Sequence, residues 1–141
     1  DIHKEELNKI DNKRKAIGLY GKVSENKDVL LYIMRSFNKS VDSSLTLEFL
    51  QTEVWKLMEW DVNFFTEVVG DPRIITKIKM YDFVNFGLIT KKDGFYYDSE
   101  GKKLALDGKQ NDINGAAEFL DSGIGSEMRL VLEAKIESLK K

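Results

Sequence analysis

Apolar residues recur at a helical period through the first half of the chain. The run over residues 27–37, with Asp28 as a candidate N-cap, predicts a buried helix. Residues 45–60 place their apolar side chains on one helical face, and these side chains are Leu47, Leu50, Val54, Leu57 and Met58. Asp61 is a candidate N-cap for a short helix over residues 62–69. The pattern therefore predicts three consecutive helices.

The only proline of the chain, Pro72, marks the start of a fourth helix. Gly70 fits the C′ position at the end of the preceding helix. Asp71 and Pro72 then have the residue types that favour the N-cap and the first helical position. We predict a helix over residues 72–86 that ends at Gly87.

The period of the pattern changes from helical to extended after this helix. Two short β-prone runs flank Asp93 and Gly94. Asp-Gly between such runs is the strongest short signal for a β-hairpin. The sequence therefore predicts a hairpin over residues 88–97.

The remaining chain alternates turn-forming and helical segments. Asp98 is a candidate cap for a short helical turn, residues 111–115 are a predicted loop, and residues 116–120 are predicted to be helical. A final helix is predicted over residues 127–140. Its apolar positions share one face, and they are Met128, Val131, Leu132 and Leu139.

The order of these elements carries a resemblance to a known class of domain. A long helix, a short helix, a glycine turn, a helix and a hairpin follow one another, with Gly87-Leu88-Ile89 before the hairpin and Ser99-Glu100-Gly101 after it. This order resembles a winged helix-turn-helix domain, a class of DNA-binding domain found in transcriptional regulators, over about residues 27–105. The resemblance implies that residues 72–86 form the recognition helix and residues 88–97 the wing.

The resemblance implies a fold class and a division of the chain. We expect a mostly α fold with a small β-hairpin wing (α+β) and flanking N- and C-terminal helices. Residues 27–109 would form the winged-helix domain. Residues 1–26 would form a charged N-terminal arm or helix, and residues 110–141 a C-terminal helical segment that serves as a candidate dimerisation element.

Charge is distributed unevenly along the chain. The 141 residues carry a formal net charge of −2, whereas residues 71–109 carry eight basic and six acidic side chains. A protein that held nucleic acid over a wide surface would be basic overall. Contact with a polyanion must therefore be local, and double-stranded DNA at the recognition helix and wing is the partner that the resemblance implies.

The candidate DNA-binding residues lie on three segments. They are Arg73, Thr76, Lys77, Lys79 and Met80 on the recognition helix, Lys91 and Lys92 on the wing, and Arg14 and Lys15 on the arm. Winged-helix domains bury the positions that Thr76, Lys79, Met80 and Phe83 occupy here. Shifting the register so that Ile75 and Ile78 face the core leaves Thr76, Lys77 and Met80 outside, and we prefer this register because it fits the Asp-Pro start.

Other interpretations remain open for the same residues. The recognition helix is apolar around most of its circumference, which favours contact with protein on more than one side. The first alternative is thus a winged-helix module that binds a protein partner. Because the chain begins with Asp1, a second alternative is the DNA-recognition module of a larger DNA-processing enzyme such as a restriction endonuclease. The last helix is expected to pair with its twin in a homodimer.

Catalytic chemistry has little support in the sequence. There is one histidine and no cysteine, and we find no phosphate-binding loop, nucleophile elbow or dinucleotide fingerprint. We therefore expect no enzyme activity, no catalytic residues, no metal and no cofactor. No apolar run approaches the length of about 18–20 residues that spans a membrane. Together with the lack of cysteine, this predicts a cytoplasmic protein without membrane contact.

Overall fold

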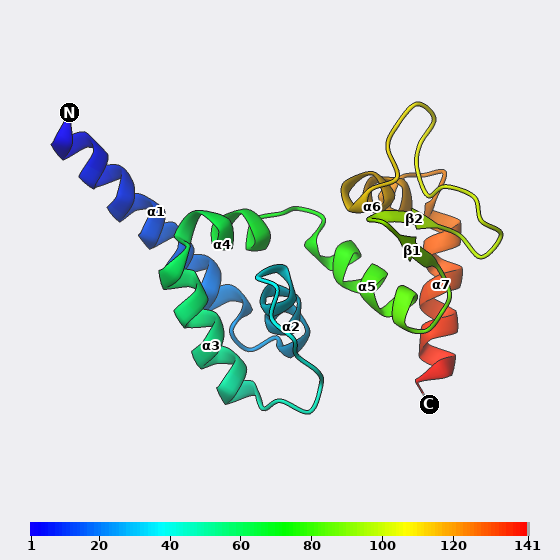
Figure 1. Cartoon of the computed structure of the whole chain (residues 1–141), viewed down its shortest axis with the longest axis horizontal. Coiled ribbons are helices and arrows are strands. Elements are labelled where there is room, and N and C mark those ends of the chain that lie inside the picture. The colour runs from blue at the N-terminus through cyan, green and yellow to red at the C-terminus, as the bar shows by residue number, and fades with distance from the viewer. Residues whose placement is uncertain (141) are drawn as a thin grey trace. The chain divides into compact units, whose positions relative to one another are not determined.

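The computed structural model describes residues 1–140, and their contacts divide the chain into two compact units (Figure 1). Unit 1 comprises residues 1–74, and unit 2 begins at Ile75. The elements of unit 1 are helices α1 (Ile2–Val23), α2 (Lys27–Ser36), α3 (Leu47–Trp60) and α4 (Val62–Val69). Those of unit 2 are helix α5 (Ile74–Asn85), strands β1 (Thr90–Lys92) and β2 (Phe95–Tyr97), and helices α6 (Ile113–Asp121) and α7 (Ser126–Leu139). The predicted mostly α composition with a small antiparallel sheet is confirmed.

The division into units differs from the predicted domains. The boundary after Ile74 falls inside the segment 27–109 that we assigned to one winged-helix domain. It assigns α4 to unit 1 and nearly all of α5 to unit 2, so the two helices of the predicted helix-turn-helix belong to different units. The winged-helix assignment therefore stays a prediction.

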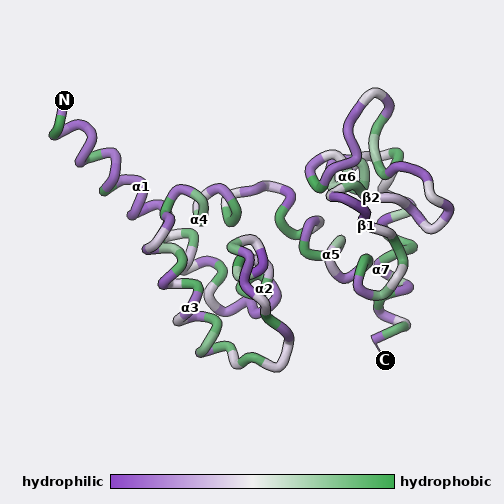
Figure 2. The backbone as a smooth tube through the Cα atoms, viewed as in Figure 1, coloured by the Kyte–Doolittle hydropathy of each residue, from purple (hydrophilic) through white to green (hydrophobic). Residues whose placement is uncertain are grey.

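Unit 1 is built entirely from helices around an apolar core. Helix α1 packs against α4, and α2 packs against α3 and α4. The fully buried side chains of this core include Leu30, Ile33, Leu50, Val54, Met58 and Phe65. In α1 only Ala16 is buried, and Figure 2 shows that the N-terminal turns of this helix are mostly hydrophilic. The predicted charged N-terminal segment is thus a helix whose second half joins the core.

Polar caps begin the helices of unit 1. The Asp61 carboxylate accepts a hydrogen bond of 3.0 Å from the Phe64 N–H at the start of α4, as predicted. The buried positions of α3 belong to the predicted face. The N-cap of α2, however, is Asn26 rather than Asp28, and its side chain accepts from the Val29 N–H at 3.2 Å. Asparagine and aspartate are about equally good caps, so propensity did not distinguish them.

Helix α5 begins two residues later than predicted. The Asp71 carboxylate accepts from the Arg73 N–H at 2.9 Å, which forms a turn over Pro72 before the helix starts at Ile74. At the other end Gly87 has a φ of +73°. The Leu88 N–H donates to the Phe83 carbonyl at 2.9 Å, the 6→1 bond of a Schellman motif. The predicted stop at Gly87 is confirmed.

The hairpin of unit 2 has the predicted turn. Strands β1 and β2 are antiparallel, and Lys92 pairs with Phe95 across a two-residue turn. Asp93 and Gly94 have φ values of +54° and +83°, as both central residues of a type I′ turn require. The paired residues Thr90–Lys92 and Phe95–Tyr97 lie within the predicted wing.

The chain after the hairpin returns to the edge of β2 instead of forming the predicted helical turn. The Asp98 carboxylate accepts from the Glu100 and Lys102 N–H groups at 2.8 and 2.9 Å, so its capping capacity closes a loop. Lys103 then pairs with Tyr97 in an isolated antiparallel bridge. The predicted loop over residues 111–115 is also partly wrong, because Asp112 caps α6 there.

The core of unit 2 joins α5, the hairpin, α6 and α7. Its buried residues are Met80, Phe83, Ile89, Tyr96, Leu104, Ala116, Ala117, Leu120, Leu132 and Ile136. The predicted face of α7 is only partly correct, because Val131 and Leu139 are 48% and 52% exposed while Ile136 is buried. Among residues 1–140, no helix is both long and apolar enough to cross a membrane.

Candidate nucleic-acid interface

The polar residues of α5 that were predicted to meet DNA face the core of unit 2. Thr76 and Lys77 are each 8% exposed, and Met80 is completely buried. Ile75, which we assigned to the core, is 53% exposed. The preferred register was therefore wrong: Thr76, Met80 and Phe83 face inward, while Lys79, the fourth position that winged-helix domains bury, is partly exposed.

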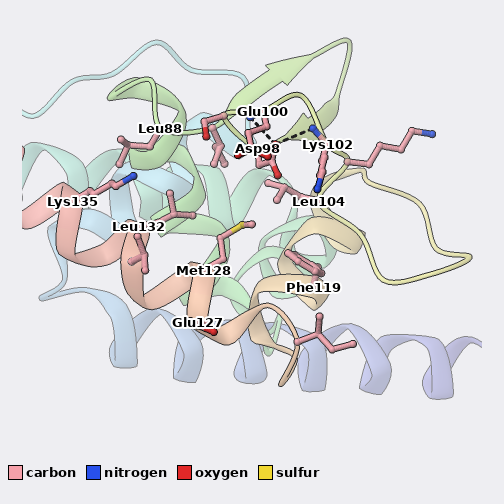
Figure 3. A pocket seen from close by; sticks show the side chains of 15 residues that line it. Leu88, Asp98, Glu100, Lys102, Leu104, Phe119, Glu127, Met128, Leu132 and Lys135 are labelled. Carbon is pink, nitrogen blue, oxygen red and sulfur yellow. Dashed lines mark hydrogen bonds between the residues drawn. The ribbon is translucent and has the colours of Figure 1, made fainter.

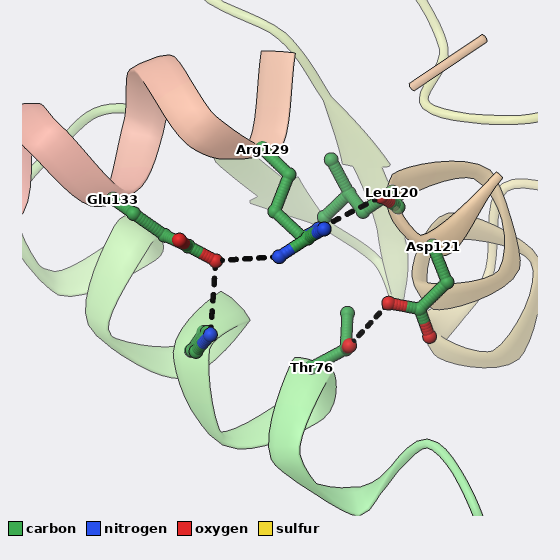
Figure 4. A network of polar contacts seen from close by, with 6 residues as sticks. Thr76, Leu120, Asp121, Arg129 and Glu133 are labelled. Carbon is green, nitrogen blue, oxygen red and sulfur yellow. Dashed lines mark hydrogen bonds and ion pairs between the residues drawn. The ribbon is translucent and has the colours of Figure 1, made fainter. Parts of the chain in front are cut away.

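Each buried polar group on α5 has a partner on α6. The Thr76 hydroxyl donates to Asp121 Oδ1 at 2.5 Å, as Figure 4 shows. The Lys77 ammonium donates to Asn114 Oδ1 at 2.5 Å. A polar group that leaves water must recover its hydrogen bonds within the protein, and these bonds supply that recovery. They also commit Thr76 and Lys77 to holding α5 against α6.

Lys79 belongs to a second polar cluster, centred on Glu133 of α7, whose members Glu133, Arg129 and Leu120 are labelled in Figure 4. Glu133 Oε1 accepts from Lys79 Nζ and from Arg129 Nη1, both at 2.9 Å, and Arg129 Nε donates to the Leu120 carbonyl at 3.2 Å. The hydrogen bond from Lys79 lowers the pKa of Glu133 below its ordinary value, burial opposes this effect, and the bond from Arg129 lowers the pKa further. The cluster connects α5, α6 and α7.

This cluster makes the free energy of unfolding depend on pH in the acidic range. Because the pKa of Glu133 is lowered in the folded state, the ionised carboxylate stabilises the fold. This stabilisation is fully present above the ordinary pKa of 4.5 and is lost as the pH falls through the folded-state pKa. Glu133→Gln should therefore lower the free energy of unfolding at neutral pH by about 1–2 kcal/mol. The difference from wild type should shrink below pH 4.5 in urea titrations. Glu137→Gln, on an exposed position of the same helix, should cost less than about 0.5 kcal/mol.

The remaining basic candidates occupy different surroundings. Arg73 is half-buried and lies in the turn before α5 instead of in its first turn. In unit 1, Arg14 and Lys15 are exposed on α1, and Arg14 Nη1 lies 3.9 Å from Asp11 Oδ1. The structure therefore does not bring the nine predicted residues together on one element or in one unit.

The hairpin lysines are the candidates that stay exposed within unit 2. All three residues of β1, including Lys91 and Lys92, are exposed. The Lys91 ammonium lies 5.9 Å from the centroid of the Tyr96 ring, which is within the range of a cation–π contact. Burial raises the pKa of the Tyr96 hydroxyl, so this tyrosine stays neutral at physiological pH. Lys91 thus lies on the Tyr96 side of the hairpin, and Lys92, which pairs with Phe95, lies on the other side.

Four residues that were not predicted from the sequence share a face with Lys92. In paired antiparallel strands, residues opposite each other and residues two apart share a face. Thr90, Lys92, Phe95, Tyr97 and Lys103 therefore form one face, which we call the ribbon face. Phe95 is 38% exposed, whereas Tyr96 is buried on the opposite side. The run Phe95-Tyr96-Tyr97 contains only aromatic residues, so the sequence alone did not show which of them face outward.

Unit 2 also has an open pocket of about 560 Å³ between α7 and the loop after β2 (Figure 3). Its apolar lining includes Leu88, Leu104, Phe119, Met128 and Leu132. Its charged rim includes Asp98, Glu100, Lys102, Glu127 and Lys135. The rim mixes both signs, so the pocket does not select an anion or a cation by charge.

Comparison with known proteins gives no further indication of function. No protein-family model matches the chain, and neither the curated proteins nor the solved structures contain a match. Within residues 1–140, no three histidine, aspartate or glutamate side chains are grouped closely enough to hold a metal ion. The candidate interface therefore rests on the geometry of unit 2.

Proposed function

We propose that the chain binds nucleic acid through the β1–β2 hairpin of unit 2, with double-stranded DNA as the first ligand to test. The observation that carries this proposal is that Lys91 and Lys92 remain exposed on the hairpin while the polar residues of α5 are bonded within the core. Lysines on a projecting hairpin contact phosphates, as the wing of a DNA-binding domain does. A cytoplasmic location is part of the proposal.

The buried face of α5 changes what kind of binding is proposed. Sequence-specific recognition in the major groove needs exposed side chains that reach base edges. Thr76, Lys77 and Met80 are not exposed, so they do not support the predicted role in base recognition. Binding through the hairpin would depend on phosphate contacts and therefore strongly on salt. This favours a general nucleic-acid-binding role over that of a sequence-specific transcriptional regulator.

Charge reversal on the hairpin tests the proposal. The double variant Lys91→Glu/Lys92→Glu should weaken duplex binding by about tenfold or more, and the salt dependence should fall by about two units of log K per log salt. Fluorescence polarisation at about 50 mM and about 200 mM salt measures both quantities. Lys39→Glu/Lys109→Glu, which reverses two exposed lysines outside the hairpin, is the charge-matched control. Equal losses in the two variants, or no binding of either duplex or single-stranded DNA at low salt by wild type, would contradict the proposal.

A protein-binding module is the second candidate function. Exposed apolar side chains lie on α5 and directly after it: Ile75 and Tyr81 of the helix are 53% and 37% exposed, and Phe86 after it is 41% exposed. Helix faces of this kind dock onto apolar grooves of partner proteins. Salt-insensitive capture of a partner that is lost in Ile75→Asp would favour this candidate, provided that Lys91→Glu/Lys92→Glu retains the capture.

Homodimerisation through the last helix also stays a prediction. Leu130, Val131 and Leu139 of α7 are 59%, 48% and 52% exposed, so an apolar surface exists for a second copy. A mass measurement by light scattering, with Leu130→Asp as the disrupting variant, decides between monomer and dimer.

The same mass measurement on the product of the complete gene addresses the alternative that this chain is a module of a larger DNA-processing enzyme.

A further inference from the structure

The ribbon face combines outward aromatic rings with lysines on both sides. We infer that this face binds the unpaired bases of a single-stranded nucleic acid, with Phe95 and Tyr97 as stacking platforms and Lys92 and Lys103 as phosphate contacts. The inference rests on the proposed function and names its ligand class. The hairpin that carries the face is labelled β1 and β2 in Figure 1.

Strand pairing determines which side chains share the ribbon face. Lys92 lies opposite Phe95, and Thr90 lies opposite Tyr97 in the β1–β2 register. On the other edge of β2, Tyr97 pairs with Lys103, which also borders the pocket beside α7. Tyr97 is therefore flanked by Thr90 of β1 on one edge and by the isolated bridge at Lys103 on the other. The two aromatic residues Phe95 and Tyr97 are about 7 Å apart along β2.

The two faces of the hairpin differ in how deeply their side chains are buried. Tyr96 is 5% exposed and packs in the core of unit 2, while Phe95 is 38% exposed and Tyr97 is half-buried. The Tyr96 N–H donates to the Asn111 carbonyl at 2.9 Å, and its carbonyl accepts from the Leu104 N–H at 3.0 Å. These bonds fix β2 from the side opposite β1. The ribbon face is consequently held rigidly, which lowers the entropy cost of stacking a base on it.

The chemistry of this face favours unpaired bases over a duplex. In a duplex the bases are stacked on one another, and only their edges are accessible in the grooves. An aromatic ring can stack face to face on an unstacked base. Such stacking does not depend on the base sequence. Lysines beside the rings neutralise the phosphates of the same strand. A neutral partner would not use the lysines, and a duplex would not use the rings.

The test compares matched single-stranded and duplex probes. We would measure fluorescence polarisation of a labelled mixed-sequence DNA of about twelve nucleotides, alone and as its duplex, with an RNA of the same sequence as a third probe. The wild-type chain should bind the single strands at least about fivefold more tightly than the duplex. Phe95→Ala should weaken single-strand binding by about tenfold and change duplex binding by less than about twofold.

Matched variants separate stacking from folding. Phe95→Tyr keeps an aromatic ring and should keep single-strand binding, whereas Phe95→Leu keeps an apolar side chain and should lose it. Phe86→Ala removes an aromatic ring of similar exposure, 41%, from outside the ribbon face and should have no effect. Circular dichroism of each variant shows whether the fold is retained.

Two results would overturn the inference in different ways. If Phe95→Ala and Tyr97→Ala leave single-strand affinity unchanged while Lys91→Glu/Lys92→Glu lowers it, the hairpin binds phosphates alone. The proposed function then stands, and the stacking role fails. If the wild-type chain binds none of the three probes at low salt, the inference and the proposed function both fail.

Discussion

Met80→Ala should lower the free energy of unfolding of unit 2 by about 2–5 kcal/mol. Met80 is completely buried in the core that joins α5, the hairpin, α6 and α7, so its truncation removes apolar contacts and leaves a cavity. Urea unfolding followed by circular dichroism measures the loss. Hydrogen exchange of peptides from residues 75–140 shows whether the loss is located in unit 2.

Ile75→Ala is the matched control for this prediction, because Ile75 lies on the same helix and is 53% exposed. It should change the free energy of unfolding by less than about 1 kcal/mol. The two variants together test the register of α5. If Met80→Ala changed the free energy of unfolding little and Ile75→Ala changed it strongly, Ile75 would be the buried residue. This result would support the register that we preferred from the sequence and would contradict the structure.

Gly125→Ala should destabilise the chain by about 3 kcal/mol or more. Gly125 is the N-cap of α7, and a Cβ atom built there would lie 2.0 Å from the Phe119 carbonyl oxygen and 2.8 Å from its carbon. These are backbone atoms of α6, so the clash can be relieved only by moving the end of one helix away from the start of the next. Thermal or urea unfolding measures the effect.

Gly123→Ala provides the control two residues away in the same Gly-Ile-Gly stretch. A Cβ atom at Gly123 meets nothing within 4 Å. Alanine there should leave the free energy of unfolding unchanged or raise it by about 0.4–1 kcal/mol, because alanine gives the unfolded chain less conformational entropy than glycine does. Similar losses in both variants would mean that the connection needs flexibility in general, whereas we expect a specific close contact at Gly125.

The local signals in the sequence predicted most of the elements. Asp61 as the cap of α4, the Schellman stop at Gly87 and the Asp93-Gly94 turn each depend on neighbouring residues, and each is present in the structure. The hairpin followed because both turn positions need a positive φ. Caps and turns of this kind were predictable because their energetics do not require knowledge of distant residues.

The face that α5 presents to the core was not predictable in the same way. Helix α5 has apolar residues around most of its surface, so the pattern left two registers that differ in whether Ile75 or Met80 is buried. The partners that decide the register are distant in sequence. Asn114 and Asp121 on α6 bind Lys77 and Thr76, and no short-range signal marks them as partners.

The boundary between the units and the ribbon face were missed for related reasons. The boundary lies between Ile74 and Ile75 at the start of a helix, and we interpreted the Gly70-Asp71-Pro72 turn just before it as a turn within one domain. The ribbon face needs the register of β1 on β2 and the return of Lys103 to the edge of β2. Both features arise from contacts that form only when the chain has folded.

A map of amide chemical shifts during titration with a single-stranded oligonucleotide tests the central claim most directly. The claim is that the hairpin of unit 2 meets nucleic acid and that the polar face of α5 does not. We predict that the largest shift changes fall on Lys92, Phe95, Tyr97 and Lys103, with little change at residues 76–80. Changes centred on residues 76–80, or no change on the hairpin at saturating oligonucleotide, would contradict the account.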